Sequence, residues 1–110
     1  MIPSRQAALT QLLQRLGIEE TGDMATLLLI DRALTHISTG LDQNHERLEF
    51  LGDAVLRLTA TEFIDRQHPT LSVGACSNLR AQLVSDRWLA ELGQRIELEP
   101  LLNLGAKAQG

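Results

Sequence analysis

The sequence has 110 residues and a formal net charge of −4, and 44% of its residues are hydrophobic while only 3% are aromatic. These values indicate one globular domain, residues 1–110, rather than a disordered chain or several domains. No apolar run approaches the roughly 20 residues that span a membrane, and Cys76 has no second cysteine for a disulfide or a zinc cluster. We therefore expect a cytoplasmic protein with no contact to membranes.

The negative charge bears on possible partners. Proteins that bind nucleic acid are commonly basic because they neutralise phosphates, so composition alone argues against RNA. A metal-dependent nuclease escapes this objection in part, because its bound cations supply positive charge at the site.

The periodicity of apolar residues predicts an all-α chain, since Leu and Ala dominate and the residue types enriched in strands are few. Start and stop signals such as Ser72, Ser85 and Gly17 divide the chain. The expected helices are, in order, residues 4–16, 24–36, 44–66, 71–83 and 85–92, with a short turn at 97–102.

The helix expected over residues 44–66 is the informative one. Asn44 is a good N-cap, and Pro69 forces an end. Gly52 lies mid-helix, where it costs about 1 kcal/mol against Ala. Such a glycine indicates that another backbone or a partner's side chain approaches closely.

Three carboxylates lie on this helix at positions i, i+3 and i+7, namely Glu46, Glu49 and Asp53. The spacing places them within an arc of about 60° on one face, where they repel one another. A divalent cation would relieve the repulsion, and hard oxygen ligands suit Mg²⁺ or Mn²⁺. The alternative is a solvated acidic face tempered by Arg47 and Arg57.

The residues around the carboxylates carry a resemblance. Residues 46–56 read E-R-L-E-F-L-G-D-A-V-L, which resembles the signature of the ribonuclease III family at every position. Residues 33–38 (A-L-T-H-I-S) and 77–84 (S-N-L-R-A-Q-L-V) resemble the segments that precede and follow that signature. The resemblance extends over about residues 27–105.

The resemblance implies a ribonuclease III endonuclease-domain-like helical fold and Mg²⁺-dependent hydrolysis of phosphodiesters in double-stranded RNA. It implies that Glu49 and Asp53 are catalytic residues that bind the metal, with Glu46 supporting them from nearby. The arginine of the following segment, here Arg80, would make a salt bridge or a phosphate contact.

The resemblance also implies a homodimer built on the signature helix. Phe50 would pack into a socket on the partner, and Gly52 would let the partner come close. Because Phe50 lies between carboxylates that face water or metal, we expect it to be exposed in the isolated subunit.

The chain departs from the family pattern at several points. The family has two further metal carboxylates in a later D-x-x-E pair, whereas no Asp or Glu follows Glu99 here. We expect no double-stranded-RNA-binding domain within the 110 residues, Ile37 stands where the family usually has an arginine, and Val73 stands where many members have an acidic residue. We therefore expect a C-terminally incomplete domain.

Three interpretations of the chain remain open. The first is a piece of an active endoribonuclease. The second is an inactive homologue that serves as a dimerisation or RNA-binding module. The third is a helical protein with an incidental acidic stripe, which the signature makes improbable. The sequence beyond residue 110 would distinguish the first two.

Other side chains fit ordinary structural roles. His36 and His45 have no third ligand at zinc spacing, so capping or surface positions are expected for both. For Trp88 we favour core packing over base stacking, and for Cys76 a buried position.

Overall fold

The computed structural model describes residues 1–19 and 23–106, and the regular structure in these ranges is helical. The elements are α1 (Pro3–Arg15), α2 (Met24–Ala33), the 3₁₀ turn η1 (Ile37–Thr39), α3 (Glu46–Gln67), α4 (Val73–Leu83), α5 (Asp86–Arg95) and the 3₁₀ turn η2 (Glu99–Leu101). The described ranges contain no strand, which confirms the predicted all-α class.

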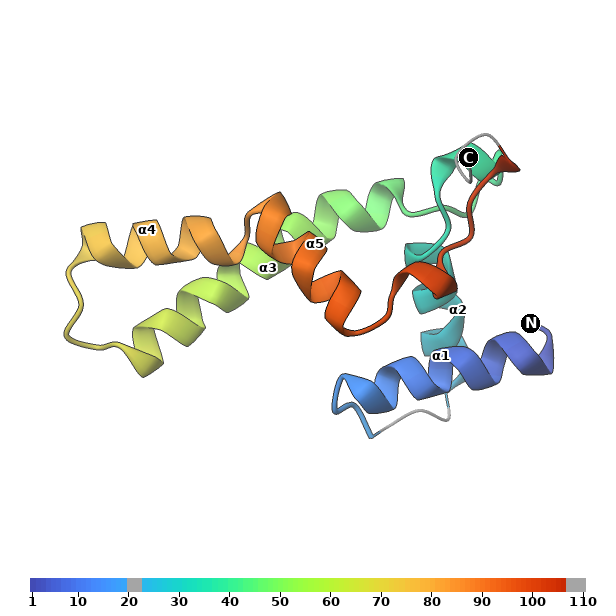
Figure 1. Cartoon of the computed structure of the whole chain (residues 1–110), viewed down its shortest axis with the longest axis horizontal. Coiled ribbons are helices and arrows are strands. Elements are labelled where there is room, and N and C mark those ends of the chain that lie inside the picture. The colour runs from blue at the N-terminus through green and yellow to red at the C-terminus, as the bar shows by residue number, and fades with distance from the viewer. Residues whose placement is uncertain (20–22, 107–110) are drawn as a thin grey trace.

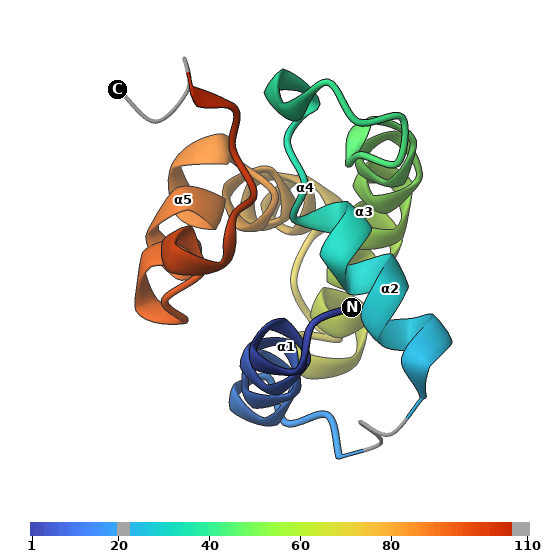
Figure 2. The same cartoon turned by 90° about the vertical axis from the view of Figure 1, so that its right-hand side faces the viewer.

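The helices form an elongated, open arrangement (Figure 1). α3 and α4 make an antiparallel hairpin at one end, α5 packs against α4 and lies apart from α3 in the second view, and α1 and α2 lie at the other end (Figures 1 and 2). The molecule measures 49 × 32 × 23 Å and its radius of gyration is 16.2 Å. A compact domain of this length would have a radius of gyration of about 13 Å.

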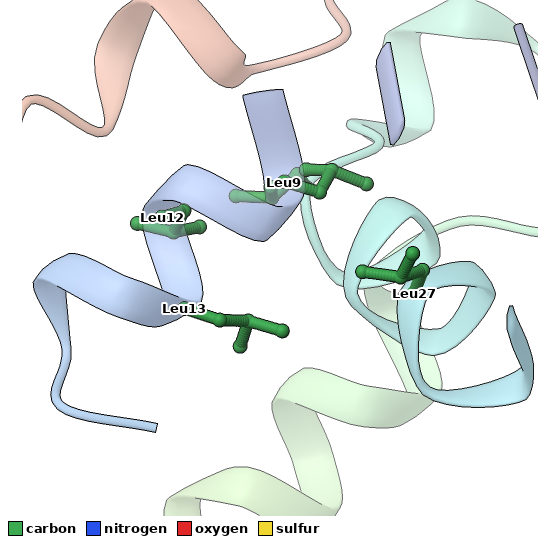
Figure 3. Packing of buried hydrophobic residues seen from close by; sticks show 5 residues of the cluster. Leu9, Leu12, Leu13 and Leu27 are labelled. Atoms are coloured by element: carbon green, nitrogen blue, oxygen red, sulfur yellow. The ribbon is translucent and has the colours of Figure 1, made fainter. Parts of the chain in front are cut away.

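The main core joins α1 to α2 and the residue that follows α2. Leu9 and Leu13 extend from α1 toward Leu27 of α2, and Leu12 and Leu34 belong to the same buried cluster (Figure 3). The i, i+3, i+4 spacing places the three α1 leucines on one side of that helix. Each fully buried leucine stabilises the fold by roughly 1.5–3 kcal/mol. A second, smaller buried patch lies on α3.

Helices α4 and α5 begin directly after serine residues that the sequence predicts as N-caps. The Ser72 hydroxyl accepts a hydrogen bond from the Ala75 N–H at 3.1 Å, and the Ser85 hydroxyl accepts one from the Trp88 N–H at 3.2 Å. α1 ends where Gly17 adopts a φ of 77°, a conformation that glycine reaches without steric cost. The predicted signals at Ser72, Ser85 and Gly17 are therefore confirmed.

Two predicted helix ends are wrong. α2 stops at Ala33 rather than at residue 36, because Leu34 and His36 pair instead with Asn103 in a parallel bridge. The Asn103 N–H donates to Leu34 O and the His36 N–H donates to Asn103 O, both at 2.9 Å. α5 continues through Gly93 to Arg95, since one glycine costs a helix only about 1 kcal/mol.

α3 begins two residues later than predicted. His45 occupies the cap position, while the Asn44 side chain accepts a hydrogen bond from the Glu46 N–H at 3.0 Å. Asn44 therefore caps the helix from one residue upstream. The far end at Gln67, just before Pro69, agrees with the prediction within one residue.

A polar cluster ties the N-terminal helices to the chain after η2. Arg5 Nε donates to Asp31 Oδ1 at 2.8 Å, and Asn103 Nδ2 donates to Asp31 Oδ1 at 3.3 Å and to Thr35 Oγ1 at 3.0 Å. Thr35 is almost fully buried, and its hydroxyl donates to the Asp31 carbonyl at 2.7 Å. The cluster holds the segment that leads into α3.

None of the helices in the described ranges has the length and apolar character needed to cross a bilayer.

Candidate functional site

The candidate site lies on the first two turns of α3. Glu46, Glu49 and Asp53 all belong to this continuous helix, so they share one face as the spacing predicts. The side chains of Glu49 and Asp53 are 72% and 67% exposed, and Glu46 is exposed as well. The two glutamates also lie in the first turn, where the helix dipole stabilises negative charge.

Each of the two predicted metal ligands contacts one basic side chain. The neighbour of Glu49 lies one helical turn before it, and the neighbour of Asp53 lies one turn after it. His45 Nδ1 lies 2.9 Å from Glu49 Oε2, and Arg57 Nε lies 3.6 Å from Asp53 Oδ2. The second pair is exposed on both sides and contributes little to stability. One oxygen of each carboxylate thus remains open to solvent and to a cation.

The arrangement fits a metal ion in part. Among the described residues, no group of three or more His, Cys, Asp or Glu side chains is placed to hold a metal ion. The acidic face of α3 is therefore not a preformed cage. Mg²⁺ is commonly held by one or two carboxylates together with waters and substrate phosphates, and Glu49 and Asp53 match that donor set. Mn²⁺ accepts the same oxygen ligands.

The two histidines before the site stack on each other. The ring centroids of His36 and His45 are 5.3 Å apart and the ring planes differ by 20°. His36 is exposed, and its Nδ1 accepts a hydrogen bond from the Ser38 N–H at 3.1 Å, which agrees with the predicted capping role. His45 is half-buried and also contacts Glu49, a role that the sequence interpretation did not include.

The predicted interface residues lie next to the acidic face. Phe50 is 71% exposed, as expected for the isolated subunit, and it borders an open hollow of about 510 Å³ together with Arg32 and Arg47. A Cβ atom added to Gly52 would meet nothing within 4 Å. The close approach predicted for Gly52 therefore does not come from the described part of its own subunit.

Arg80 is not brought to the carboxylates. Its guanidinium donates to Thr61 Oγ1 at 3.1 Å, and Thr61 lies eight residues beyond Asp53 on α3. At 1.5 Å per residue this separation is about 12 Å along the helix axis. In the described ranges Arg80 forms no ion pair and instead joins α4 to α3.

Residues 27–110 match the family model described as ribonuclease-III-like. The chain belongs to the ribonuclease III family. It is 56% identical over 82 residues to ribonuclease 3 of Prochlorococcus marinus, in an alignment covering 74% of this chain and 33% of that relative. It is 45% identical over 102 residues to a ribonuclease 3 of Synechocystis, covering 93% of this chain and 41% of that protein.

A solved structure agrees with the ribonuclease III assignment. The nuclease domain of ribonuclease III from Campylobacter jejuni, described for structural flexibility in a region involved in dimer formation, superposes with a TM-score of 0.76 at 35% identity. The superposition covers 89% of this chain and 66% of that one. The predicted ribonuclease III endonuclease-domain-like fold is thus confirmed, and the chain spans 33–41% of the length of the two curated relatives above.

Two predictions about single residues need correction in this ribonuclease III domain. Cys76 is half-buried rather than buried, and it lines an open groove of about 270 Å³ between α3 and α4. Trp88 is also half-buried, with the Arg95 guanidinium 5.5 Å from its ring centroid. Both exceptions follow from the open packing of α4 and α5, which leaves one side of each helix uncovered.

The His45–Glu49 contact could have been found in the sequence. A histidine at i and a glutamate at i+4 on one helix face can hydrogen-bond. His45 directly precedes Glu46, the first predicted carboxylate, so the spacing of His45 and Glu49 is the sequence signal for this contact.

Proposed function

We propose that this chain provides the signature-helix part of an endoribonuclease domain that hydrolyses double-stranded RNA with a divalent metal during RNA processing. The observation that carries the proposal is the pair Glu49 and Asp53, one turn apart and exposed on α3. Family membership supports the same activity.

Glu49 and Asp53 would hold Mg²⁺, or Mn²⁺, through their open oxygens. When bound, the cation supplies an activated water and neutralises charge on the phosphodiester. Glu46 adds negative charge to the same face from the first turn. Arg80 lies on α4, and we still predict that it contacts a phosphate of the RNA.

The substrate proposal rests on the family and on charge. The chain itself carries a net charge of −4, so its affinity for RNA would depend on the bound cation. Double-stranded RNA would be recognised by its A-form shape and its 2′-hydroxyl groups rather than by base sequence.

We propose a homodimer as the working form. Phe50 presents a large apolar ring to solvent beside the acidic face, and 71% of it is exposed in the described subunit. The C. jejuni neighbour is described in connection with dimer formation, which supports this interpretation.

The test is a cleavage assay on long double-stranded RNA with Mg²⁺. The proteins are the chain itself and a chimaera in which the remaining part of the P. marinus relative follows it. We expect the chain alone to cut poorly, because it contributes only Glu49 and Asp53, and the chimaera to cut well. In the chimaera, Glu49→Gln or Asp53→Asn should slow cleavage by about 100-fold or more, since the metal supplies several kcal/mol.

Glu62→Gln is the matched control, because Glu62 is exposed on the opposite side of α3 and the substitution removes the same charge. The site assignment fails if Asp53→Asn leaves the rate intact. A folded chimaera that dimerises and binds RNA without cutting it would instead favour an inactive binding module.

A further inference from the structure

We propose that His45 is a positioning residue that fixes the carboxylate of Glu49, and that the stacked His36 and residues 103–105 hold His45 in place. The inference rests on the proposed function, because it assumes that Glu49 binds the metal. It names the groups that orient the Glu49 carboxylate before a cation binds.

The contact between His45 and Glu49 joins a half-buried side chain to an exposed one. The Glu49 side chain is 72% exposed, whereas the His45 side chain is 25% exposed and lies at the start of α3. An exposed glutamate samples many rotamers, and ordering it costs free energy. The hydrogen bond at 2.9 Å restricts the carboxylate before any ligand binds.

The ring of His45 is held from one side by His36. The two rings stack at 5.3 Å, and the His36 ring is itself fixed because its Nδ1 lies 3.1 Å from the Ser38 N–H and 2.7 Å from the Ser38 hydroxyl. The Ser38 hydroxyl oxygen accepts a hydrogen bond from the Gly105 N–H at 2.9 Å. A chain of contacts thus runs from Gly105 to Glu49.

The backbone fixes the same two histidines. The His45 N–H donates to Thr35 O at 2.9 Å, and the His36 N–H donates to Asn103 O at 2.9 Å. Thr35 is anchored in the buried polar cluster below. The backbones of the two histidines are therefore held by hydrogen bonds to Thr35 and Asn103, two residues that the fold itself keeps in place.

The hydrogen bond has a defined direction. The carboxylate of Glu49 only accepts, so His45 Nδ1 must carry the proton. His45 Nε2 is buried and has no hydrogen-bond partner in the described part of the chain. The contact by which the ring orients Glu49 is therefore the hydrogen bond from Nδ1.

This geometry gives the two carboxylate oxygens of Glu49 different partners. Oε2 accepts from His45, and Oε1 is left for a cation. Hydrogen bonds that orient a ligating carboxylate in this way commonly contribute 10- to 100-fold to metal affinity, as a rough guide. We expect the same order of effect from His45.

The first experiment compares Mn²⁺ binding to the full chain and its variants by electron paramagnetic resonance. His45→Phe keeps a stacking ring but removes the donor, and His45→Asn keeps an N–H donor near the Nδ1 position but loses the ring. We expect His45→Phe to raise the Kd by about 10-fold and His45→Asn to restore most of the affinity. Glu49→Gln is the reference variant, and thermal unfolding checks that each variant folds.

The outcomes separate the inference from the proposed function. If Glu49→Gln weakens binding and His45→Phe does not, the inference is overturned and the proposed site stands. If both folded His45 variants bind equally weakly, the hydrogen bond is not the cause and the inference is also overturned. If Glu49→Gln binds Mn²⁺ as the unmodified chain does, the proposed metal ligand itself is wrong.

A second measurement needs no variant and no metal. Long-range ¹H–¹⁵N NMR of the unmodified chain at a pH of about 8.5, where imidazole is neutral, reports which ring nitrogen carries the proton. We expect His45 to be protonated on Nδ1. A spectrum showing the proton on Nε2 overturns the inference even where His45→Phe fails to fold.

Discussion

At the scale of single residues, two glycines illustrate opposite requirements. A Cβ on Gly105 would overlap the backbone carbonyl of Ser38, whereas a Cβ on Gly52 would meet nothing within 4 Å. Gly105 is therefore needed for the subunit's own packing. Gly52 has no such role in the described subunit, so its predicted role concerns a partner.

We predict that Gly105→Ala destabilises the fold. The backbone of Ser38 cannot move aside as a flexible side chain would, so residues 103–105 must shift or detach. The free energy of unfolding should fall by about 1–3 kcal/mol in urea denaturation, as for other overpacked sites. An unchanged unfolding midpoint for Gly105→Ala would show that this contact does not matter.

We predict the opposite sign for Gly52→Ala. Alanine favours a helix interior by about 1 kcal/mol over glycine, and space is available, so the subunit should become more stable. Self-association should weaken if a partner approaches at this position. Denaturation at low concentration together with analytical ultracentrifugation separates the two effects, and a variant that is more stable and equally associated would remove Gly52 from the interface.

At the scale of elements, one face of α3 is exposed and acidic in its first half and buried in its second half. Helical geometry places Ala60 and Ile64, the buried residues of α3, on the same side as Glu49 and Asp53. The second half of this side packs in the fold, mainly against α4, while the first half is acidic and exposed. The packed half thus orients the helix, and the exposed half carries the proposed chemistry.

The caps on neighbouring helices set where this packing begins. We predict that Ser72→Ala lowers the free energy of unfolding by about 1 kcal/mol, because the Ala75 N–H at the start of α4 loses its acceptor. Ser77→Ala is the control, since Ser77 is exposed within α4 and alanine is a better helix former there. Equal stability of the two variants in thermal unfolding would contradict the capping role.

At the scale of the whole molecule, the fold leaves much apolar surface uncovered. Leu51, Val55 and Leu58 on α3 are 52–63% exposed, although all three are large apolar side chains. The radius of gyration of 16.2 Å expresses the same openness. Contiguous exposed apolar residues of this kind mark surfaces that other protein segments cover.

We predict that Phe50→Ala weakens homodimerisation by about 2–4 kcal/mol, the range of residues that dominate an interface. Val73→Ala is the control, because Val73 is 82% exposed and is the first residue of α4, a different helix from the one that carries Phe50. Sedimentation should show dissociation for Phe50→Ala alone. An unchanged dimer in this variant would place the interface elsewhere.

The approximate positions of the helices, their caps at Ser72 and Ser85, and the order of the carboxylates on α3 could be predicted from the sequence, because these features depend on neighbours within a few residues. The eleven-residue signature determined the family. The end of α2 at Ala33 could not be predicted in this way, since the competing hydrogen bonds come from Asn103, far along the chain. The same holds for the stacking of His36 on His45 and for the exposure of Leu51, because these depend on which segments the folded backbone brings together and which it leaves apart.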